Sequence, residues 1–278
     1  FPDMLNDKAR EWFGNKYRIL IDKGIDGFWN DMNEPAIFYS EKRLKKVFEK
    51  LDECKAMNLD VNSFFEMTEL VSTIANNPED YASFYHNYKG KRYRHDRVHN
   101  LFGYCMTRSA SEAFQRYLPE KRILLFSRAS YIGMHRYGGI WQGDNLSWWS
   151  HLKMNVQMMP SLNMCGYLYT GADTGGFGAD VTEDLLLRWM EFAVFTPLFR
   201  NHSARGTRQQ EVYRFSHEER FLNVIGARYQ LLPYLYSEYM KAALSGTMMF
   251  SPLSFVYGKD ALARQVEGIS NVTLVMDT

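Results

Sequence analysis

The apolar positions near the start of the chain predict a helix that leads into a buried strand. Apolar residues recur three and four positions apart between Asn6, a plausible N-cap, and Gly24, a plausible stop. A largely apolar run at 25–29 follows at once and predicts a strand. The strand ends in two carboxylates, Asp31 and Glu34, and in a proline, which stops regular structure.

The same order of elements repeats after residue 91. Apolar spacing predicts helices at 98–117, 147–159, 182–193 and 218–244, and strands at 123–126, 139–141, 165–169 and 194–199. Polar residues follow every strand, as in a parallel α/β architecture. The pattern favours a (β/α)8 TIM barrel over a doubly wound sheet. A full barrel takes about 250 residues and eight strands, and a large insertion leaves room here for only about five, so only the later strands are expected.

Two stretches differ in texture from this repeat. Residues 41–90 begin with a charged amphipathic run and continue as short helical segments, so we interpret them as an insertion in one loop of a barrel that covers 1–244. Beyond Leu244, strands are predicted at 248–256 and 269–276. Residues 245–278 are therefore expected to begin a C-terminal β-sandwich domain that is truncated at the end of the chain.

Composition excludes several classes of partner. The chain has 278 residues and a net charge of +1, which gives no electrostatic footprint for nucleic acid or an anionic membrane. Its cysteines, Cys54, Cys105 and Cys165, are too widely spaced for a zinc ribbon or a disulfide framework, which weakly favours the cytoplasm. The sequence starts with Phe1 and Pro2, with neither an initiator Met nor a leader pattern, so we expect an excerpt of a longer protein.

The predicted strand ends carry the residues suited to chemistry, which are Asp31, Arg128, Asp144, Asp173 and His202. Two carboxyl groups on separate strand ends are what glycoside hydrolysis needs, one as nucleophile and one as proton donor. Aromatic residues are abundant near the same loops and suit the flat apolar faces of sugars; they include Trp29, Trp141, Trp148, Trp149, Phe177 and Phe199.

The motif at 29–35, Trp-Asn-Asp-Met-Asn-Glu-Pro, closely resembles the nucleophile motif of glycoside hydrolase family 31 α-glucosidases. Later segments resemble further motifs of that family in the same order; these are 99–108, 126–130, 141–145, 188–190, 199–202 and 233–236. The resemblance implies a TIM barrel and a retaining, exo-acting α-glucosidase that removes terminal glucose from α-linked oligosaccharides through a covalent glycosyl-aspartate. It implies no metal and no cofactor.

The resemblance also implies roles for single residues. Asp31 would be the nucleophile, kept ionised by Arg128, and Asp144 the acid/base. Arg128 and His202 would bind hydroxyls of the terminal sugar. The remaining residues of the expected substrate pocket are Trp29, Met32, Trp141, Asp173 and Phe177.

Each of these residues also has a structural alternative. Asp144 could merely cap the helix that begins near Ser147, and Asp173 stands in glycine-rich sequence typical of a turn. Glu34 is expected to support the loop of Asp31 rather than react. His202 could be a structural loop histidine, and Arg128 a buried counter-ion alone.

Other functions remain open at this point. Within the family, an α-glucosyl transferase or an α-xylosidase is the alternative, and outside it an inactive carbohydrate-binding fragment. A metal hydrolase is weaker, because His95 and His99 form a pair four residues apart with no evident third ligand. The resemblance implies early barrel strands and flanking β domains that these residues do not include, so we expect the 278 residues alone to be inactive or poorly folded.

Overall fold

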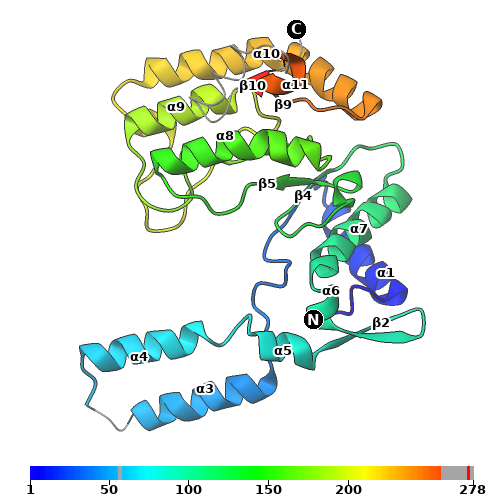
Figure 1. The fold of residues 1–278 in the computed structure, drawn as a ribbon, viewed down its shortest axis with the longest axis vertical. Coiled ribbons are helices and arrows are strands. Elements are labelled where there is room, and N and C mark those ends of the chain that lie inside the picture. Colours follow the sequence, from blue (N-terminus) through cyan, green and yellow to red (C-terminus); the bar gives the residue numbers. More distant parts are fainter. Residues whose placement is uncertain (56–57, 258–273, 276–278) are drawn as a thin grey trace. The chain divides into compact units, whose positions relative to one another are not determined.

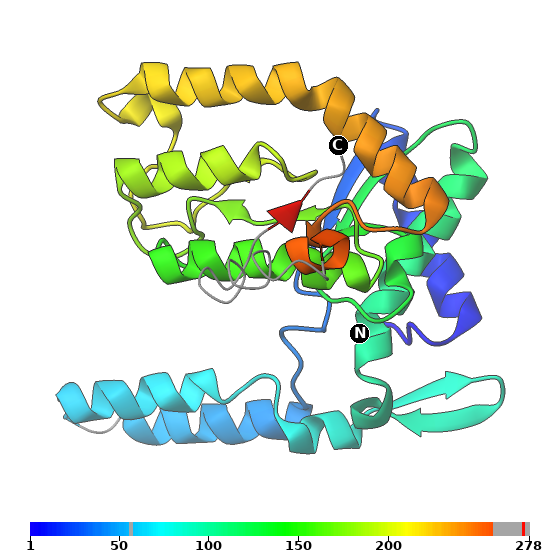
Figure 2. The same ribbon diagram turned by 45° about the horizontal axis from the view of Figure 1, so that its top comes forward.

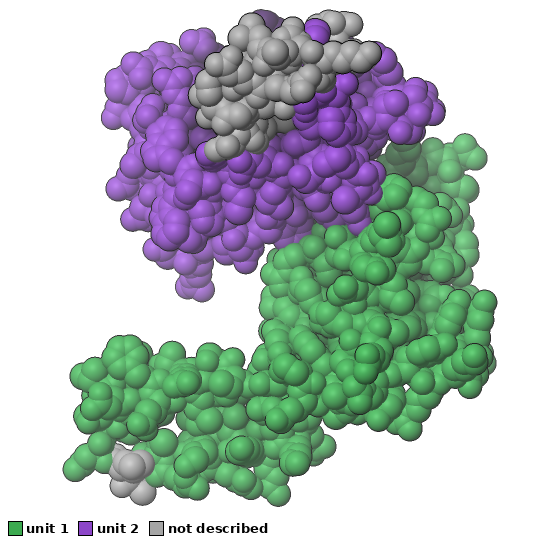
Figure 3. Space-filling view, viewed as in Figure 1, with its two compact units in different colours: residues 1–137 green, residues 138–278 purple. Residues whose placement is uncertain are grey.

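A computed structural model of the chain describes residues 1–55, 58–257 and 274–275. The chain forms two compact units, residues 1–137 and residues 138–278, coloured separately in Figure 3. No helix in these described ranges is both long and apolar enough to cross a lipid bilayer.

The first unit begins as the sequence predicts. Helix α1 (Asp7–Lys16) is capped by Asn6, whose side chain accepts the backbone N–H groups of Lys8 and Ala9. The short helix α2 (Arg18–Ile21) follows, and Gly24 ends this region with a φ of 84°. The predicted cap and stop are thus confirmed, and both are local effects of side-chain hydrogen bonding and backbone freedom.

A parallel strand pair and a long helix form the centre of this unit. Strand β1 (Gly27–Asn30) pairs in parallel with β4 (Leu124–Ser127), with Gly27 opposite Leu124. Helix α7 (Asn100–Tyr117) covers the pair, and its apolar face packs on both strands in a cluster of Phe28, Ala110, Phe114 and Leu125. Both strands end where polar residues begin, so Asp31 and Arg128 directly follow neighbouring strand ends.

The long connection between β1 and α7 begins with helices and continues with a hairpin. The helices are α3 (Glu41–Cys54), α4 (Val61–Ser72) and α5 (Pro78–Ser83). The hairpin, which the sequence analysis did not predict, pairs β2 (Tyr85–Tyr88) with β3 (Lys91–Arg94), and the short helix α6 (His95–Val98) follows. Lys89 and Gly90 both have positive φ, as a two-residue hairpin turn requires.

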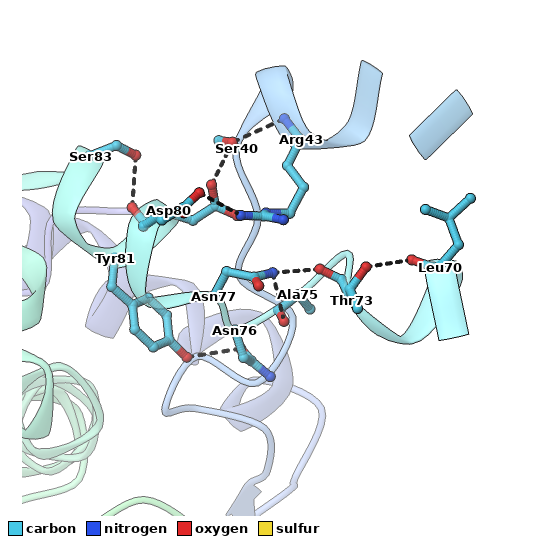
Figure 4. Close-up of polar contacts among 11 residues, drawn as sticks. Ser40, Arg43, Leu70, Thr73, Ala75, Asn76, Asn77, Asp80, Tyr81 and Ser83 are labelled. Carbon is cyan, nitrogen blue, oxygen red and sulfur yellow. Dashed lines mark hydrogen bonds and ion pairs between the residues drawn. The ribbon is translucent and has the colours of Figure 1, made fainter. Parts of the chain in front are cut away.

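A buried carboxylate holds the α3–α4 helical hairpin at its base (Figure 4). Asp80, in α5, accepts hydrogen bonds from the Ser40 hydroxyl at 2.7 Å and from Arg43 Nε at 2.8 Å. Ser40 also caps α3 by accepting the backbone N–H of Arg43. In the same close-up, the Tyr81 hydroxyl donates to Asn76 Oδ1 at 3.0 Å. The base is therefore polar and specific.

The second unit repeats the order strand, helix, strand. Strand β5 (Gly139–Trp141) pairs in parallel with β6 (Thr170–Gly171), and helix α8 (Trp149–Met164) lies in the connection between them. Strand β7 (Asp173–Thr174) likewise pairs in parallel with β8 (Arg200–Asn201), and helix α9 (Glu183–Ala193) lies in the connection. Helix α10 (Glu218–Ser245) completes the layer, and α8, α9 and α10 run side by side in Figures 1 and 2. The short 3-10 helix η2 (Val212–Arg214) precedes α10, and another, η1 (Met134–Arg136), lies near the end of the first unit.

Two strands of this unit were predicted a few residues too early in the chain. Residues 165–169 and 194–199 are not strands; the strand residues follow them, in β6 and β8. The apolar residues at these places finish the preceding helices, since Tyr167 donates to the carbonyl of Leu162 and Thr196 to that of Ala193. Apolar runs that end a helix resemble buried strands in sequence.

The chain after α10 also departs from expectation. Instead of a strand over 248–256, the structure has β9 (Ser251–Pro252) followed by the helix α11 (Leu253–Tyr257). The side chain of Asn163 accepts the backbone N–H groups of Met249 and Phe250, which prevents strand pairing there. Of the strand predicted at 269–276, only β10 (Leu274–Val275) is described, antiparallel to β9; its other residues, like 258–268, lie outside the described residues.

Candidate active site

The loop after β1 is fixed by the residue between its two acids. Asn33 is buried, and its Nδ2 donates to Ser127 Oγ at 2.8 Å while its Oδ1 accepts the backbone N–H of Ala129 at 2.9 Å. Both partners lie at or just after the end of β4. Asp31 is left half exposed, with Oδ1 accepting the backbone N–H of Met32 at 2.7 Å.

Arg128 joins the two acids of this loop. Its Nε and Nη2 donate to the two carboxylate oxygens of Glu34 at 2.7 and 3.0 Å, and its Nη1 lies 3.1 Å from Asp31 Oδ1. Burial opposes ionisation of Glu34, but the hydrogen bonds and charge of Arg128 outweigh it, so the pKa of the Glu34 carboxyl is lowered. The arrangement places one cation beside two carboxylates.

Two other predicted pocket residues lie in the same unit. The Trp29 ring, on β1, stacks on Phe126 with ring centroids 4.6 Å apart and an interplanar angle of 21°. The Met32 side chain is exposed, and its backbone has a φ of 56°, which non-glycine residues rarely adopt. The structure therefore groups Trp29, Asp31, Met32 and Arg128 at the ends of β1 and β4.

Asp144 stands after β5 and does not cap the following helix. The cap position of α8 is Trp148, and no side chain caps that end. The next residue, Asn145, is buried and holds the loop: its Nδ2 donates to Asn155 Oδ1 at 2.8 Å, and its Oδ1 accepts the N–H of Phe177 at 2.8 Å. The Asp144 side chain is exposed at a loop whose backbone is fixed. The helix-cap alternative is thereby excluded.

Asp173 is fully buried and forms an ion pair that the sequence analysis missed. Its Oδ1 accepts a hydrogen bond from Arg200 Nη2, and its Oδ2 has no hydrogen-bond partner. Burial raises the pKa of the Asp173 carboxyl; Arg200 and His202 oppose this shift, and the charge of Asp144 adds to it. Asp173 is thus more than a turn residue.

The other predicted residues of the second unit lie around this ion pair. The Phe177 ring stacks on His202, with centroids 5.3 Å apart, and the Arg200 guanidinium lies 5.9 Å from the Trp141 ring centre. Asp144 is close enough to influence the Asp173 carboxyl electrostatically. Trp141, Asp144, Asp173, Phe177 and His202 therefore form one group. The sequence did offer a signal for Arg200, because a cationic residue directly after a predicted strand is a candidate site residue.

Asn33 and Asn145 were also missed, and they play equivalent parts. Each lies within two residues of a candidate catalytic Asp, is buried, and uses both ends of its amide to tie the loop to another element. Amides in this position gave no signal, because a polar residue in a loop is ordinarily solvated.

The structure brings His95 and His99 together in the first unit. His95 Nε2 and His99 Nδ1 are hydrogen-bonded to each other at 3.0 Å. Within the described residues, no three His, Cys, Asp or Glu side chains are grouped so that they could hold a metal ion.

Residues 1–238 match the family model for the glycosyl hydrolases family 31 TIM-barrel domain. Alpha-glucosidase 2 of Bacillus thermoamyloliquefaciens is 36% identical over 262 residues, which are 94% of this chain and 29% of the relative. An alpha-glucosidase of Saccharolobus solfataricus is 30% identical over 268 residues, 94% of this chain and 36% of the relative. The chain thus spans only about a third of these relatives' length.

Solved structures support the same fold. A family 31 alpha-glucosidase from Bacteroides thetaiotaomicron superposes with a TM-score of 0.70 at 30% identity, over 95% of this chain and 37% of the other. A family 31 dextranase from Flavobacterium johnsoniae, complexed with glucose, gives a TM-score of 0.72 at 24% identity, over 94% of this chain and 29% of the other. The predicted α/β TIM-barrel class is confirmed.

Proposed function

Because the chain belongs to glycosyl hydrolase family 31, we propose that the protein containing it is a retaining α-glucosidase that releases terminal glucose from the non-reducing ends of α-linked oligosaccharides. The observation that carries the proposal is the Asp31 carboxylate, half exposed after a parallel strand and paired with Arg128 at 3.1 Å. The names of the relatives, which are alpha-glucosidases, support the choice of substrate.

In the proposed mechanism Asp31 is the nucleophile. One of its carboxylate oxygens attacks the anomeric carbon of the terminal glucose while the glycosidic C–O bond breaks, and Asp144 donates its proton to the leaving oxygen. Asp144, now a carboxylate, then takes a proton from water as that water attacks the anomeric carbon and releases Asp31. Two inversions at one carbon give net retention.

The remaining predicted residues are proposed to bind the sugar. Arg128 and His202 would hydrogen-bond ring hydroxyls, and Asp173 would lie beside the pocket with its second carboxylate oxygen, which is buried and without a partner. Three aromatic rings and a thioether would supply apolar walls; these are Trp29, Trp141, Phe177 and Met32. The buried ion pair with Arg200 supports a fixed position for Asp173.

The domain boundaries and location belong to the same proposal. We assign the barrel to 1–244, with the helical insertion at 41–90, and the start of a C-terminal β domain to 245–278. The helices α3, α4 and α5 within 41–90 support the insertion. A cytoplasmic location is supported by the three cysteines, all of which are free.

A fluorinated α-glucosyl donor tests the nucleophile. Such a donor forms the glycosyl-enzyme quickly and releases it slowly, so peptide mass spectrometry can locate the label. We expect the label on Asp31 in the protein that contains this chain, and none in the Asp31→Asn variant. A label on another residue would overturn the mechanism.

A further inference from the structure

Three histidines and an aspartate in the first unit form a continuous line of hydrogen bonds, which we call the histidine wire. Asp3 Oδ1 lies 2.8 Å from His86 Nδ1, His86 Nε2 lies 2.9 Å from His95 Nδ1, and His95 Nε2 lies 3.0 Å from His99 Nδ1. His95 is fully buried and His86 is 6% exposed. The wire therefore runs through the interior.

The direction of the hydrogen bonds follows from the Asp3 end. An ionised carboxylate only accepts, and Asp3 Oδ2 already accepts the backbone N–H of Asn87 at 2.7 Å, so His86 Nδ1 must donate to Oδ1. In the neutral wire, His86 Nε2 is then an acceptor, which requires a proton on His95 Nδ1, and the same reasoning puts a proton on His99 Nδ1. Each ring is fixed as the Nδ1–H tautomer.

The wire supports the far end of the loop that carries the acids. Phe38 follows Pro35 by three residues and is buried at 2% exposure, with its ring stacked on His95 at 4.7 Å and 13°. The Tyr81 ring lies 5.4 Å from Phe38, 5.1 Å from His95 and 4.8 Å from His99. The loop is thus tied to β4 near its start by Asn33, and to the wire at its end by Phe38.

The wire also interacts electrostatically, through His99, with a charged residue of the loop, Glu34. Burial lowers the pKa of His95 to about 4 and also lowers the pKa of His99. Asp96 acts on His95 in the opposite direction, as Glu34 does on His99, while Glu34 itself is held by Arg128. His95 and His99 are therefore neutral at pH 7, which matches the tautomers that their hydrogen bonds require.

We propose that His95 is a positioning residue for Asp31: its two hydrogen bonds and its stack on Phe38 hold residues 31–38 so that Glu34 keeps Arg128 beside the nucleophile. The assignment rests on the proposed function, since Asp31 matters only if it is the nucleophile. The competing explanation is a purely structural one, in which the wire joins the N-terminus, the β2–β3 hairpin and helices α6 and α7 without affecting the loop.

Two variants separate these explanations. His95→Phe keeps the ring that stacks on Phe38 but removes both hydrogen bonds of the wire. Phe102→Leu is the matched control, because Phe102 is buried with its ring about 6 Å from His95 and makes only apolar contacts with it. His95→Gln, whose amide both donates and accepts, is the conservative variant and should restore part of the function.

The first measurement is independent of catalysis. In the protein labelled with ¹⁵N-histidine, nitrogen chemical shifts should show the Nδ1–H tautomer for His86, His95 and His99, and an Nε2–H tautomer at His95 would overturn the wire. Hydrogen exchange of the Arg128 Nε–H, which reports the pair with Glu34, should speed up at least tenfold in His95→Phe and remain within twofold in Phe102→Leu. Equal rates in the two variants would refute positioning.

The second measurement is kinetic. A small displacement of a reacting group costs up to about 100-fold in rate, so His95→Phe should lower kcat about 10- to 100-fold with little change in KM, and Phe102→Leu should leave both within about twofold. Equal losses of kcat in the two variants would leave only the structural role. If the wild-type protein is not labelled at Asp31, the proposed function fails instead, and the exchange of Arg128 still tests the wire.

Discussion

Arg128 is the residue on which the geometry of the first half of the site depends. It lies directly after β4, its backbone N–H donates to the carbonyl of Asn30 at 3.0 Å, and its guanidinium meets both Glu34 and Asp31. A guanidinium can make this two-oxygen contact because its donors lie in a fixed plane, which a lysine ammonium cannot reproduce. Glu34 is therefore best understood as the group that orients Arg128.

Glu34→Gln tests that role. The amide keeps the shape of the carboxylate but removes its charge and one acceptor, so the bidentate contact with Arg128 is lost. We expect the free energy of unfolding to fall by about 1–2 kcal/mol in urea titrations and kcat to fall about tenfold. A variant with wild-type kcat would show that Arg128 needs no partner other than Asp31.

Asp144→Ala tests the proposed proton donor. A glucoside with a poor leaving group needs the proton, whereas a nitrophenyl glucoside with an activated leaving group does not. We expect kcat/KM to fall about 100-fold or more on the former and much less on the latter. Equal losses on the two substrates would assign Asp144 a structural role.

At the scale of elements, the helical hairpin α3–α4 depends on a few polar contacts at its base (Figure 4). Several of its large apolar side chains, including Phe48, Phe64 and Phe65, are exposed, so they add little burial. The Asp80 side chain, by contrast, is 7% exposed and its partner Arg43 is 20% exposed. Breaking a buried ion pair leaves a charge unpaired and is costly.

Asp80→Asn is expected to loosen this hairpin. The loss of the charge that faces Arg43 should lower the local opening free energy by about 2 kcal/mol, seen as faster hydrogen exchange in α3 and α4. Glu79→Gln is the matched control, since Glu79 is 89% exposed and pairs with the same arginine at 3.2 Å. It should change exchange by less than about 0.5 kcal/mol. Equal effects would show that Asp80 is not the anchor.

Alanine substitutions at two helical glycines are expected to have opposite effects on stability. A Cβ on Gly103, in α7, would lie 2.5 Å from the Cβ of Ala129 and 2.8 Å from the carbonyl oxygen of Asn33, so Gly103→Ala should cost about 2 kcal/mol and displace the loop of Asp31. A Cβ on Gly226, in α10, would meet nothing within 4 Å, so Gly226→Ala should stabilise the protein by about 1 kcal/mol.

Thermal unfolding of both variants checks these values. A neutral Gly103→Ala would mean that α7 can move away from the loop at no cost, which would contradict a fixed site.

For the molecule as a whole, each compact unit is built from parallel strands joined across a helix, as a TIM barrel requires. The chain covers 29% and 36% of the two alpha-glucosidases compared with it. The candidate residues divide between the units, with Asp31 and Arg128 in the first and Asp144, Asp173 and His202 in the second.

We expect the buried His95 of the histidine wire to make the free energy of unfolding sensitive to acid. The pKa of His95 is lowered from 6.5 to about 4, so the unfolded chain binds a proton more tightly than the folded chain. The contribution of His95 to the free energy of unfolding is therefore fully present above pH 6.5, decreases as the pH falls toward 4, and changes little below it. The total loss is up to about 3 kcal/mol. Urea denaturation between pH 7.5 and 4.5 measures the slope.

His95→Phe is the control for this slope. It should be less stable at pH 7, because His86 and His99 lose partners, but its stability should depend less on pH. A slope identical to that of the wild type would mean that other groups cause the acid sensitivity.

The sequence alone determined the local structure and the order of the acids. Asn6 capping α1, Gly24 ending the first helical region and the acids after β1 were all predicted, since caps, turns and apolar periodicity act over a few residues. The errors at 165–169 and 194–199 occurred where an apolar run suits a helix end as well as a strand.

Only the tertiary structure decided which polar groups meet. Glu34 and Arg128 are 94 residues apart, and Asp3 and His86 are 83 apart, so no local spacing could indicate either contact. Burial also changed the chemistry, because the pair His95 and His99 suggested metal ligands in sequence but is a hydrogen-bonded part of the interior. Residues that are distant in sequence meet only when the strands pair and the helices pack. The protonation and solvent exposure of each side chain depend on these neighbours.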